Sequence, residues 1–192
     1  GISKQLAPAL AQVQADHPAL IVRYLTDVRV YRLEYAEAHV AIRAGNRPVD
    51  PDYVVLPLFE QDYALYAART YAARYGLPAD ETEFAQHRFV GADDPNTRAP
   101  FLRWLAASPA QDRIVFRTND MAAMMRAVLA GTGIGFLSTD DAQGRSELIE
   151  VMPSRPEWNG NIWIVTHVDL HRSPKVQAFL KALKQAYQQI RR

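Results

Sequence analysis

The clearest hydrophobic pattern in the chain is helical and lies between Thr118–Asp120 and Gly131. Its apolar residues follow the i, i+3, i+4, i+7, i+8 spacing of an amphipathic helix: Met121, Met124, Met125, Val128 and Leu129. Three good N-cap residues precede it, and the glycine follows at the position where a left-handed residue ends a helix. Apart from Arg126 this helix carries no charge, and its opposite face is mostly alanine. We therefore expect it to be covered on more than one side.

Similar patterns predict strands and helices along the rest of the chain. Strands are expected at residues 19–26, 39–43, 53–59, 63–67, 88–90, 114–117, 134–137, 148–152 and 162–166. Helices are expected from Ser3 to His17-Pro18, at residues 29–38, 70–75 and 101–107, and from Ser173-Pro174 onward. The strand at 162–166 shows no alternation, as expected for a strand covered on both faces. Strands that alternate with helices predict an α/β fold with a largely parallel sheet.

The glycines at 131, 133 and 135 do not form a dinucleotide-binding fingerprint. That fingerprint needs a strand, then glycines, then a helix, so that a phosphate meets a helix N-terminus. Here a helix comes first and the apolar run Ile134, Phe136, Leu137 follows. The glycines therefore mark the end of a helix and a tight entry into a strand.

Composition and charge describe an ordinary globular chain. It has 192 residues, of which 48% are hydrophobic and 22% charged, with a formal net charge of +1. The arginines are scattered, so the chain shows no basic field typical of a nucleic-acid-binding domain. It has no cysteine, no apolar run long enough for a membrane span and no recognisable signal peptide.

The sequence offers no convincing catalytic or metal centre. His167 and His171 flank Asp169, but they straddle a strand end and a loop and lack a third partner. No serine stands in a G-x-S-x-G elbow, and the carboxylate pairs at 93–94 and 140–141 lie in polar loops. We therefore predict no catalytic residues, no metal and no cofactor. Helix N-termini at Ser3 and Thr118–Asp120 could instead bind a small anion, although plain capping explains these residues equally well.

Five stretches together resemble the effector-binding domain of LysR-type transcriptional regulators. The first is TND, the Met/Ala-rich helix and AGTGIGFL; the others are the helix ending in Asp16-His17-Pro18, VAIRAG at 40–45, HRFVG at 87–91, and IWIVTHVDLHRSPKVQAFL at 162–180. The resemblance covers nearly the whole chain and implies the fold of type 2 periplasmic binding proteins. One departure is His39, where the family often carries aspartate.

The resemblance implies an α/β fold of two Rossmann-like lobes joined by two crossing strands. The crossing strands would be residues 63–67 and 162–166; lobe one would comprise residues 1–64 and 164–192, and lobe two residues 65–163. A winged helix-turn-helix domain would lie upstream and is absent from this chain. The family's first lobe also begins with a strand directly before its first helix, and without that strand the first sheet would be compromised.

The resemblance also implies a site, an assembly and a location. A small effector, expected to be a small organic anion, would bind between the lobes at Ser3, Thr26, Asp27, Arg43, Ala44, Thr118, Asn119 and Gly133. Residues 4–16 and 21–25 of one copy would meet residues 121–130 and 134–137 of another in a homodimer, which would become a tetramer in the full-length protein. DNA would be bound only through the upstream domain, and the protein would be cytoplasmic.

A second function class remains open from the sequence. The same fold serves as the solute-binding receptor of ABC-type transporters, which are exported monomers. The alanine-rich face of the central helix favours the regulator, because a sensor domain must dimerise. Neither the identity of the effector nor the target promoter can be deduced from these residues.

Overall fold

The computed structural model describes the backbone of residues 2–25 and 31–190, and the side chains of residues 6–25 and 31–186. The chain forms two compact units: unit 1 comprises Gly1–Arg43, Arg47–Phe59 and Ile162–Arg192, and unit 2 comprises Ala44–Asn46 and Glu60–Asn161. The chain enters unit 2 within strand β2 (Tyr53–Gln61) and leaves it within strand β8 (Gly160–His167). The first boundary between the units therefore lies before the strand predicted at 63–67, and Asp62 separates that strand from β2.

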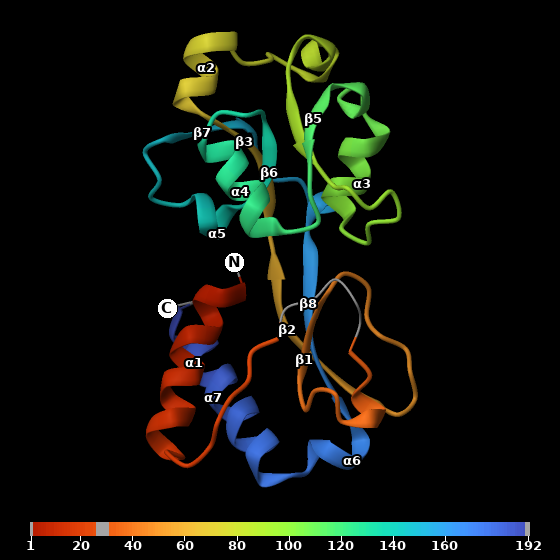
Figure 1. Cartoon of the computed structure of the whole chain (residues 1–192), viewed down its shortest axis with the longest axis vertical. Coiled ribbons are helices and arrows are strands. Elements are labelled where there is room, and N and C mark those ends of the chain that lie inside the picture. Colours follow the sequence, from red (N-terminus) through yellow and green to blue (C-terminus); the bar gives the residue numbers. More distant parts are fainter. Residues whose placement is uncertain (1, 26–30, 191–192) are drawn as a thin grey trace. The chain divides into compact units, whose positions relative to one another are not determined.

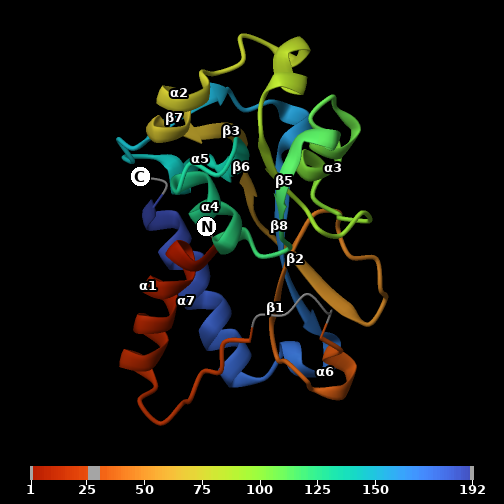
Figure 2. The same ribbon diagram turned by 45° about the horizontal axis from the view of Figure 1, so that its top comes forward.

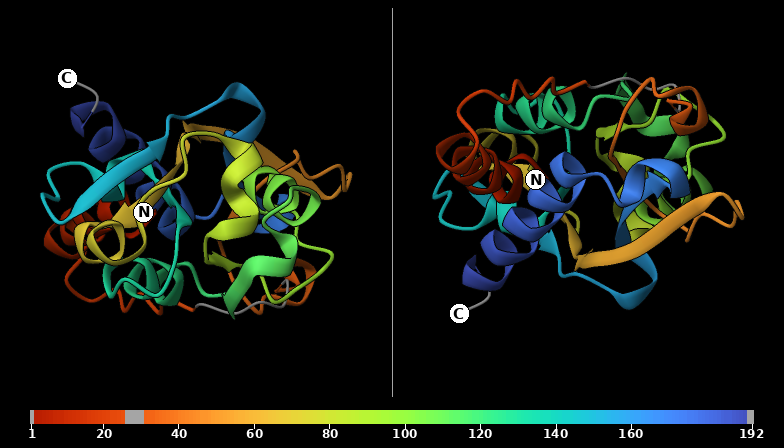
Figure 3. Two further views of the ribbon diagram at one scale, coloured as in Figure 1. Left: turned by 90° about the horizontal axis from the view of Figure 1, so that it is seen from above. Right: turned by 90° about the horizontal axis from the view of Figure 1, so that it is seen from below.

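Unit 1 is a three-stranded sheet with two long helices (Figure 1). Its strands stand in the order β1-β8-β2. Besides β2 and β8, its elements are α1 (Ile2–Asp16), η1 (Leu33–Tyr35), β1 (Ala41–Ala44), α6 (Val168–His171) and α7 (Pro174–Ile190). Helices α1 and α7 lie side by side, as the view from below in Figure 3 also shows, and they bury Leu6, Val13 and Leu183 between them. The predicted first and last helices are confirmed.

Two elements predicted for unit 1 are wrong. Residues 19–25 form no strand, and Ile21 and Tyr24 are 86% and 59% exposed. The described sheet has no strand beside this segment, so its β-branched residues have no ladder to join. The helix predicted at 29–38 is reduced, in its described part, to the single turn η1, because Ala36 takes φ +54° in the left-handed region and ends it.

Unit 2 contains the remaining elements, arranged around a three-stranded sheet in the order β6-β3-β7 and a two-stranded sheet of β4 and β5. Its elements are β3 (Tyr63–Ala68), α2 (Arg69–Tyr75), η2 (Glu81–Gln86), β4 (Phe89–Gly91), α3 (Pro100–Ala107), η3 (Gln111–Arg113), β5 (Ile114–Arg117), α4 (Met121–Leu129), β6 (Gly135–Ser138), α5 (Thr139–Ala142), β7 (Leu148–Met152) and η4 (Pro156–Trp158). Strand β3 pairs antiparallel with both β6 and β7, whereas β4 and β5 are parallel. The α/β class is confirmed, but a largely parallel sheet is not.

Helices cover both faces of the three-stranded sheet in unit 2. Gly135 faces α4, since a Cβ on it would lie 2.7 Å from Val128 Cγ2. The next residue, Phe136, points to the opposite face because successive side chains alternate along a strand. There its ring meets those of Trp158 at 4.9 Å and Phe101 at 5.4 Å. Figure 2 shows α4 beside β6.

The buried face of α4 differs from the predicted one. Met124, Ala127 and Val128 are buried, whereas Met121 at the start of the methionine stripe is 38% exposed. Of the alanines expected on the opposite face, Ala127 belongs to the core of unit 2, whereas Ala122 and Ala130 are exposed. Asp120 caps the N-terminus and Gly131, with φ +77°, follows the C-terminus, so both predicted helix ends are confirmed.

Candidate functional site

Three strands of unit 2, from its two neighbouring sheets, end on the same side. Strands β4 and β5 are parallel, and the bridge between Phe89 and Ile134 is parallel as well, so the chain leaving Ile134 into β6 runs in the same direction. The last residues of these strands, Gly91, Arg117 and Ser138, therefore lie along one edge, which we term the carboxyl edge. In α/β sheets ligands bind at the carboxyl ends of the parallel strands.

The loops that follow β4 and β5 are bonded to each other. The N–H of Thr118 donates to the carbonyl of Gly91 at 3.0 Å, and the N–H of Asp94 donates to Oδ1 of Asn119 at 2.8 Å. In addition, Nη1 of Arg117 donates to the carbonyl of Ala92 at 3.3 Å. These bonds hold in place Arg117 at the end of β5 and Thr118 and Asn119 directly after it.

The start of α4 carries three polar residues with different tasks. Thr118 Oγ1 accepts from the N–H of Asp120 at 3.1 Å, and Asp120 Oδ1 accepts from the N–H of Ala122 at 2.8 Å. Asp120 is therefore the N-cap of α4, whereas Thr118 closes a turn just before the helix. Asn119 uses only its oxygen, and among the described residues its amide nitrogen has no partner. Two hydrogen-bond donors on that nitrogen are thus available at the carboxyl edge.

The end of β6 adds a second polar group to the carboxyl edge. Ser138 Oγ donates to Asp141 Oδ2 at 2.8 Å, and Ser138 is cross-strand partner to Tyr63. The ring of Tyr63 stacks on Phe101 with 3.8 Å between centroids. Burial, with a smaller contribution from the charge of Asp141, raises the pKa of Tyr63 to about 12. This phenol is therefore neutral at pH 7.

Gly133 has a packing role in the structure. It is buried, and a Cβ on it would lie 2.9 Å from the carbonyl oxygen of Arg88. The absence of a side chain lets the chain approach β4, where the N–H of Ile134 donates to that same oxygen at 2.8 Å. An effector contact by Gly133 stays a prediction.

The site residues predicted in unit 1 are only partly described. Thr26 and Asp27 lie outside the described residues, and Ser3 lies in the first turn of α1, where side chains are not described. Ala44 ends β1 and is exposed. Arg43 places its guanidinium 5.0 Å from the ring centre of Tyr53 and donates to the carbonyl of Tyr31 at 3.4 Å. These contacts engage Arg43 within its own unit.

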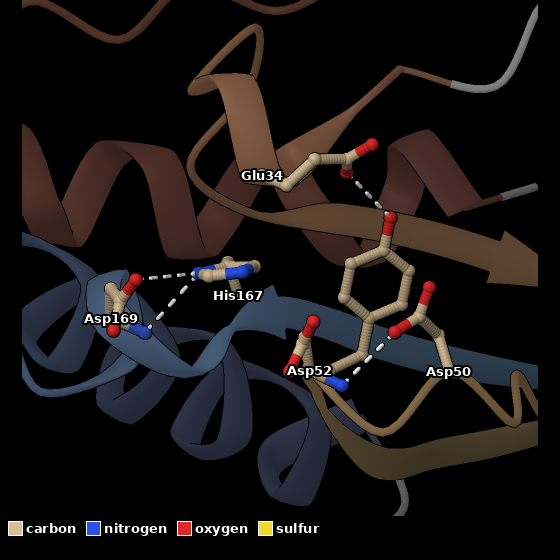
Figure 4. Close-up of polar contacts among 6 residues, drawn as sticks. Glu34, Asp50, Asp52, His167 and Asp169 are labelled. Atoms are coloured by element: carbon tan, nitrogen blue, oxygen red, sulfur yellow. Dashed lines mark hydrogen bonds and ion pairs between the residues drawn. The ribbon is translucent and has the colours of Figure 1, made fainter.

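Polar side chains also gather where β2 begins and β8 ends (Figure 4). Glu34 Oε2 accepts from the hydroxyl of Tyr53 at 3.0 Å, and His167 Nδ1 lies 3.4 Å from Asp169 Oδ2. The other histidine of the suspected pair, His171, instead meets Thr166 Oγ1 at 2.9 Å. Within the described ranges no group of three histidine, aspartate or glutamate side chains is arranged to hold a metal ion.

Sequence reasoning missed Ser138 and Tyr63 as residues of the carboxyl edge. A serine at the end of an apolar run is an ordinary strand-end residue, and the family resemblance implies only that Tyr63 belongs to a crossing strand. The antiparallel pairing of β3 with β6 brings them together, although 75 positions separate them. The one available signal was the polar run Ser138–Asp141 directly after a buried strand.

None of the helices in the described part of the chain is long and apolar enough to cross a lipid bilayer. A family model described as the LysR substrate binding domain matches residues 2–188. A comparison with curated proteins gives no match.

Solved structures show the same fold. The chain is similar to the regulatory domain of CrgA, a LysR-type transcriptional regulator from Neisseria meningitidis, with a TM-score of 0.78, 22% identity, and coverage of 94% of this chain and 90% of that one. The AmpR effector binding domain from Citrobacter freundii gives a TM-score of 0.72 at 13% identity, and the match covers 96% of this chain and 92% of that one. Full-length AphB, a virulence activator from Vibrio cholerae, gives a TM-score of 0.71 at 16% identity, and the match covers 95% of this chain but 63% of AphB. The predicted type 2 periplasmic-binding-protein fold is confirmed.

Proposed function

We infer that this chain, which belongs to the LysR substrate-binding domain family, is the ligand-sensing regulatory domain of a LysR-type transcriptional regulator. The family match over residues 2–188 is the observation that carries this conclusion. LysR-type regulators bind small-molecule effectors, oligomerise and contact DNA through an N-terminal domain. The family match favours this function over a transporter's solute receptor, and we assign no catalytic role to any residue. Location in the cytoplasm is part of the proposal.

The effector is proposed to be a small organic anion that contacts the carboxyl edge of unit 2. Support comes from the amide of Asn119, whose nitrogen has no partner among the described residues and whose oxygen is held by Asp94. The N–H groups of Met121 and Ala123, in the first turn of α4, also have no partner there. The positive end of the helix dipole adds a few tenths to about 1 kcal/mol for an anion. Asp120 opposes this, so the anion must approach from the side of Asn119.

Replacing Asn119 by aspartate tests this site. Aspartate keeps the oxygen that accepts from Asp94 but replaces the two amide donors with a charge that repels an anion. A screen of small carboxylates should find a compound that raises the melting temperature of the wild type. At about 100 times its dissociation constant the compound stabilises by roughly 2.7 kcal/mol, which corresponds to several degrees.

The Asn119→Asp variant should lose that thermal shift. Asn96→Asp is the matched control, since Asn96 is exposed in the loop after β4 and only its N–H is bonded, to Asp94. The control should respond like the wild type. An unchanged response of Asn119→Asp would place the effector elsewhere.

We also propose that the domain forms a symmetric homodimer, which becomes a tetramer in the full-length protein. Support comes from exposed or half-buried apolar side chains on α4, which include Met121, Ala122, Met125 and Leu129. Helix α1 likewise exposes Ala7, Ala11 and Ala15. Small side chains on two such surfaces suit a self-complementary interface.

Ala122→Glu should give folded monomers in sedimentation velocity, because this exposed position accepts a charge without disturbing the core. Ala127 is unsuitable for this test because it is buried. A glutamate there would unfold unit 2, and the loss of the dimer could then not be attributed to the interface. A monomeric wild type at tens of micromolar would contradict the proposal.

A further inference from the structure

Gln61, the last residue of β2 and part of unit 2, buries a side-chain amide that is only half satisfied. The residue is 3% exposed, and among the described residues its Oε1 has no hydrogen-bond partner. Its Nε2 donates to the carbonyl of Asp62 and to Asp140 Oδ2, both at 3.4 Å, which is long for such bonds. Turning the amide by 180° would bring its oxygen against these two acceptors, so this orientation is the favourable one. A buried acceptor without a donor destabilises a folded protein and calls for an explanation.

The position of Gln61 distinguishes it from the other buried polar atom that lacks a partner in the described part of the chain. That atom is Trp158 Nε1, and the indole lies in the core, with 4.9 Å between its ring centroid and that of Phe136. The neighbours of Gln61 are instead exposed, both Asp62 and Asp140. The unpaired oxygen of Gln61 therefore lies close to the surface, within reach of a molecule that binds there.

The pairing of β3 with β6 brings Gln61 to the carboxyl edge. The N–H of Thr139, the residue after β6, donates to the carbonyl of Asp62 at 3.0 Å and so continues the antiparallel register. The next step along this register sets the side chain of Gln61 beside Asp140. The connection from β4 leads to β5 on one side, whereas that from β6 leads to β7 on the other. Ligands of α/β proteins bind at the carboxyl ends of strands beside such a reversal.

The two ends of the carboxyl edge have opposite polarity. After β6, the groups near Gln61 Oε1 are further acceptors, the carbonyl of Asp62 and the carboxylate of Asp140. After β5, the available groups are donors. They are the amide nitrogen of Asn119, which has no partner among the described residues, and the N–H groups in the first turn of α4. An anion suits these donors, whereas the acceptors need a hydroxyl or an ammonium group.

We propose that Gln61 Oε1 accepts a hydrogen bond from the effector and thereby selects a carboxylate with an amino or hydroxyl group at its other end. This inference rests on the effector site proposed above. Strand β4 lies between β5 and β6, so the ends of these two strands are about 10 Å apart. The donor group therefore belongs at the far end of the molecule and not beside the carboxylate. The negative charge of Asp140 favours an ammonium group over a hydroxyl.

The first test compares carboxylates that differ only at the end expected to meet Gln61. Isothermal titration calorimetry of this chain with 6-aminohexanoate, 6-hydroxyhexanoate and hexanoate measures their dissociation constants. The two donor-bearing compounds should bind at least about tenfold more tightly than hexanoate, because hexanoate leaves the buried oxygen unpaired. The amino compound should bind most tightly. Similar dissociation constants for all three compounds would overturn the inference.

The variant Gln61→Met separates ligand binding from a purely structural task. Methionine keeps the length of the side chain and removes the amide. The variant should be at least as thermally stable as the wild type, since an unpaired buried acceptor is removed. It should bind the three compounds with dissociation constants within about threefold of one another. The matched control is Gln143→Met at an exposed position shortly after Asp140, which should leave both stability and preference unchanged.

The variants also distinguish a failure of this inference from a failure of the proposed effector site. If the preference for the donor-bearing compounds persists in Gln61→Met, the inference is wrong, and a simultaneous loss of stability would assign Gln61 a structural task. Asn119→Asp should weaken the binding of all three compounds alike, because it removes the contact to the carboxylate that they share. If none of the three compounds and no other small carboxylate binds the wild type, both proposals are wrong.

Discussion

Replacing Phe136 by alanine should destabilise unit 2 by about 4 kcal/mol, within the usual cost of removing a buried phenylalanine. The side chain is fully buried in β6, and its ring lies 4.9 Å from that of Trp158 and 6.0 Å from that of Trp104. These rings come from η4 and α3, so the truncation leaves a cavity where three elements meet. Urea unfolding followed by tryptophan fluorescence measures the loss.

Val115→Ala provides the comparison. Val115 lies in β5 of the same unit and is 54% exposed, so its truncation should change stability by no more than about 0.5 kcal/mol. Similar losses in both variants would mean that the aromatic cluster does not stabilise unit 2 as the packing indicates.

Gly133→Val should cost about 3 kcal/mol and loosen β4, because overpacking against a fixed backbone cannot be relieved by rotating a side chain. The new Cβ would lie 2.9 Å from the oxygen of Arg88 and 3.1 Å from the carbonyl carbon of Phe89. Relief requires breaking the bond from the N–H of Ile134 to that oxygen. Hydrogen exchange of Ile134 and Val90 should increase together with the loss in melting temperature.

Thr132→Val is the matched control, since it places the same side chain one residue earlier at a half-buried position and should cost less than about 1 kcal/mol. The pair of variants also separates two interpretations of Gly133. If Gly133→Val keeps its stability but loses the response to the effector, Gly133 contacts the effector, as the family resemblance implies, and the packing argument is wrong.

Elements stabilised by local interactions could be predicted from the sequence. In α4, the cap residues and the apolar residues that specify the helix lie within a few positions of one another, and the same holds for α7. Both helices form where expected. The strand predicted at 19–26 failed because a strand depends on a neighbour that its own residues do not specify. The direction of β3 was missed for the same reason, since it depends on how the chain enters and leaves unit 2.

The candidate site was predictable only where it coincides with a helix start. Thr118 and Asn119 could be named because N-cap residues are recognisable in sequence. Whether such a side chain has hydrogen-bond donors free for a ligand depends on its neighbours in space. For Asn119, the N–H of Asp94 occupies the side-chain oxygen, and the amide nitrogen has no partner among the described residues. Arg43 could be named but not its contact with Tyr53, because that contact joins β1 and β2, which are separated in the sheet by β8.

Unit 1 is built from separate stretches of the chain that lie before and after unit 2, and this has a consequence for synthesis on the ribosome. Residues 60–161 form one continuous body, so unit 2 can fold as soon as they have emerged. Unit 1 cannot, since the apolar side chains of α1, Leu6 and Val13, pack with α7 at the other end of the chain. Within unit 1 helix α1 is translated before all other elements and long before α7, and an isolated helix of 15 residues is marginally stable in water. Throughout translation its apolar stripe is therefore a surface on which a nascent-chain chaperone can act.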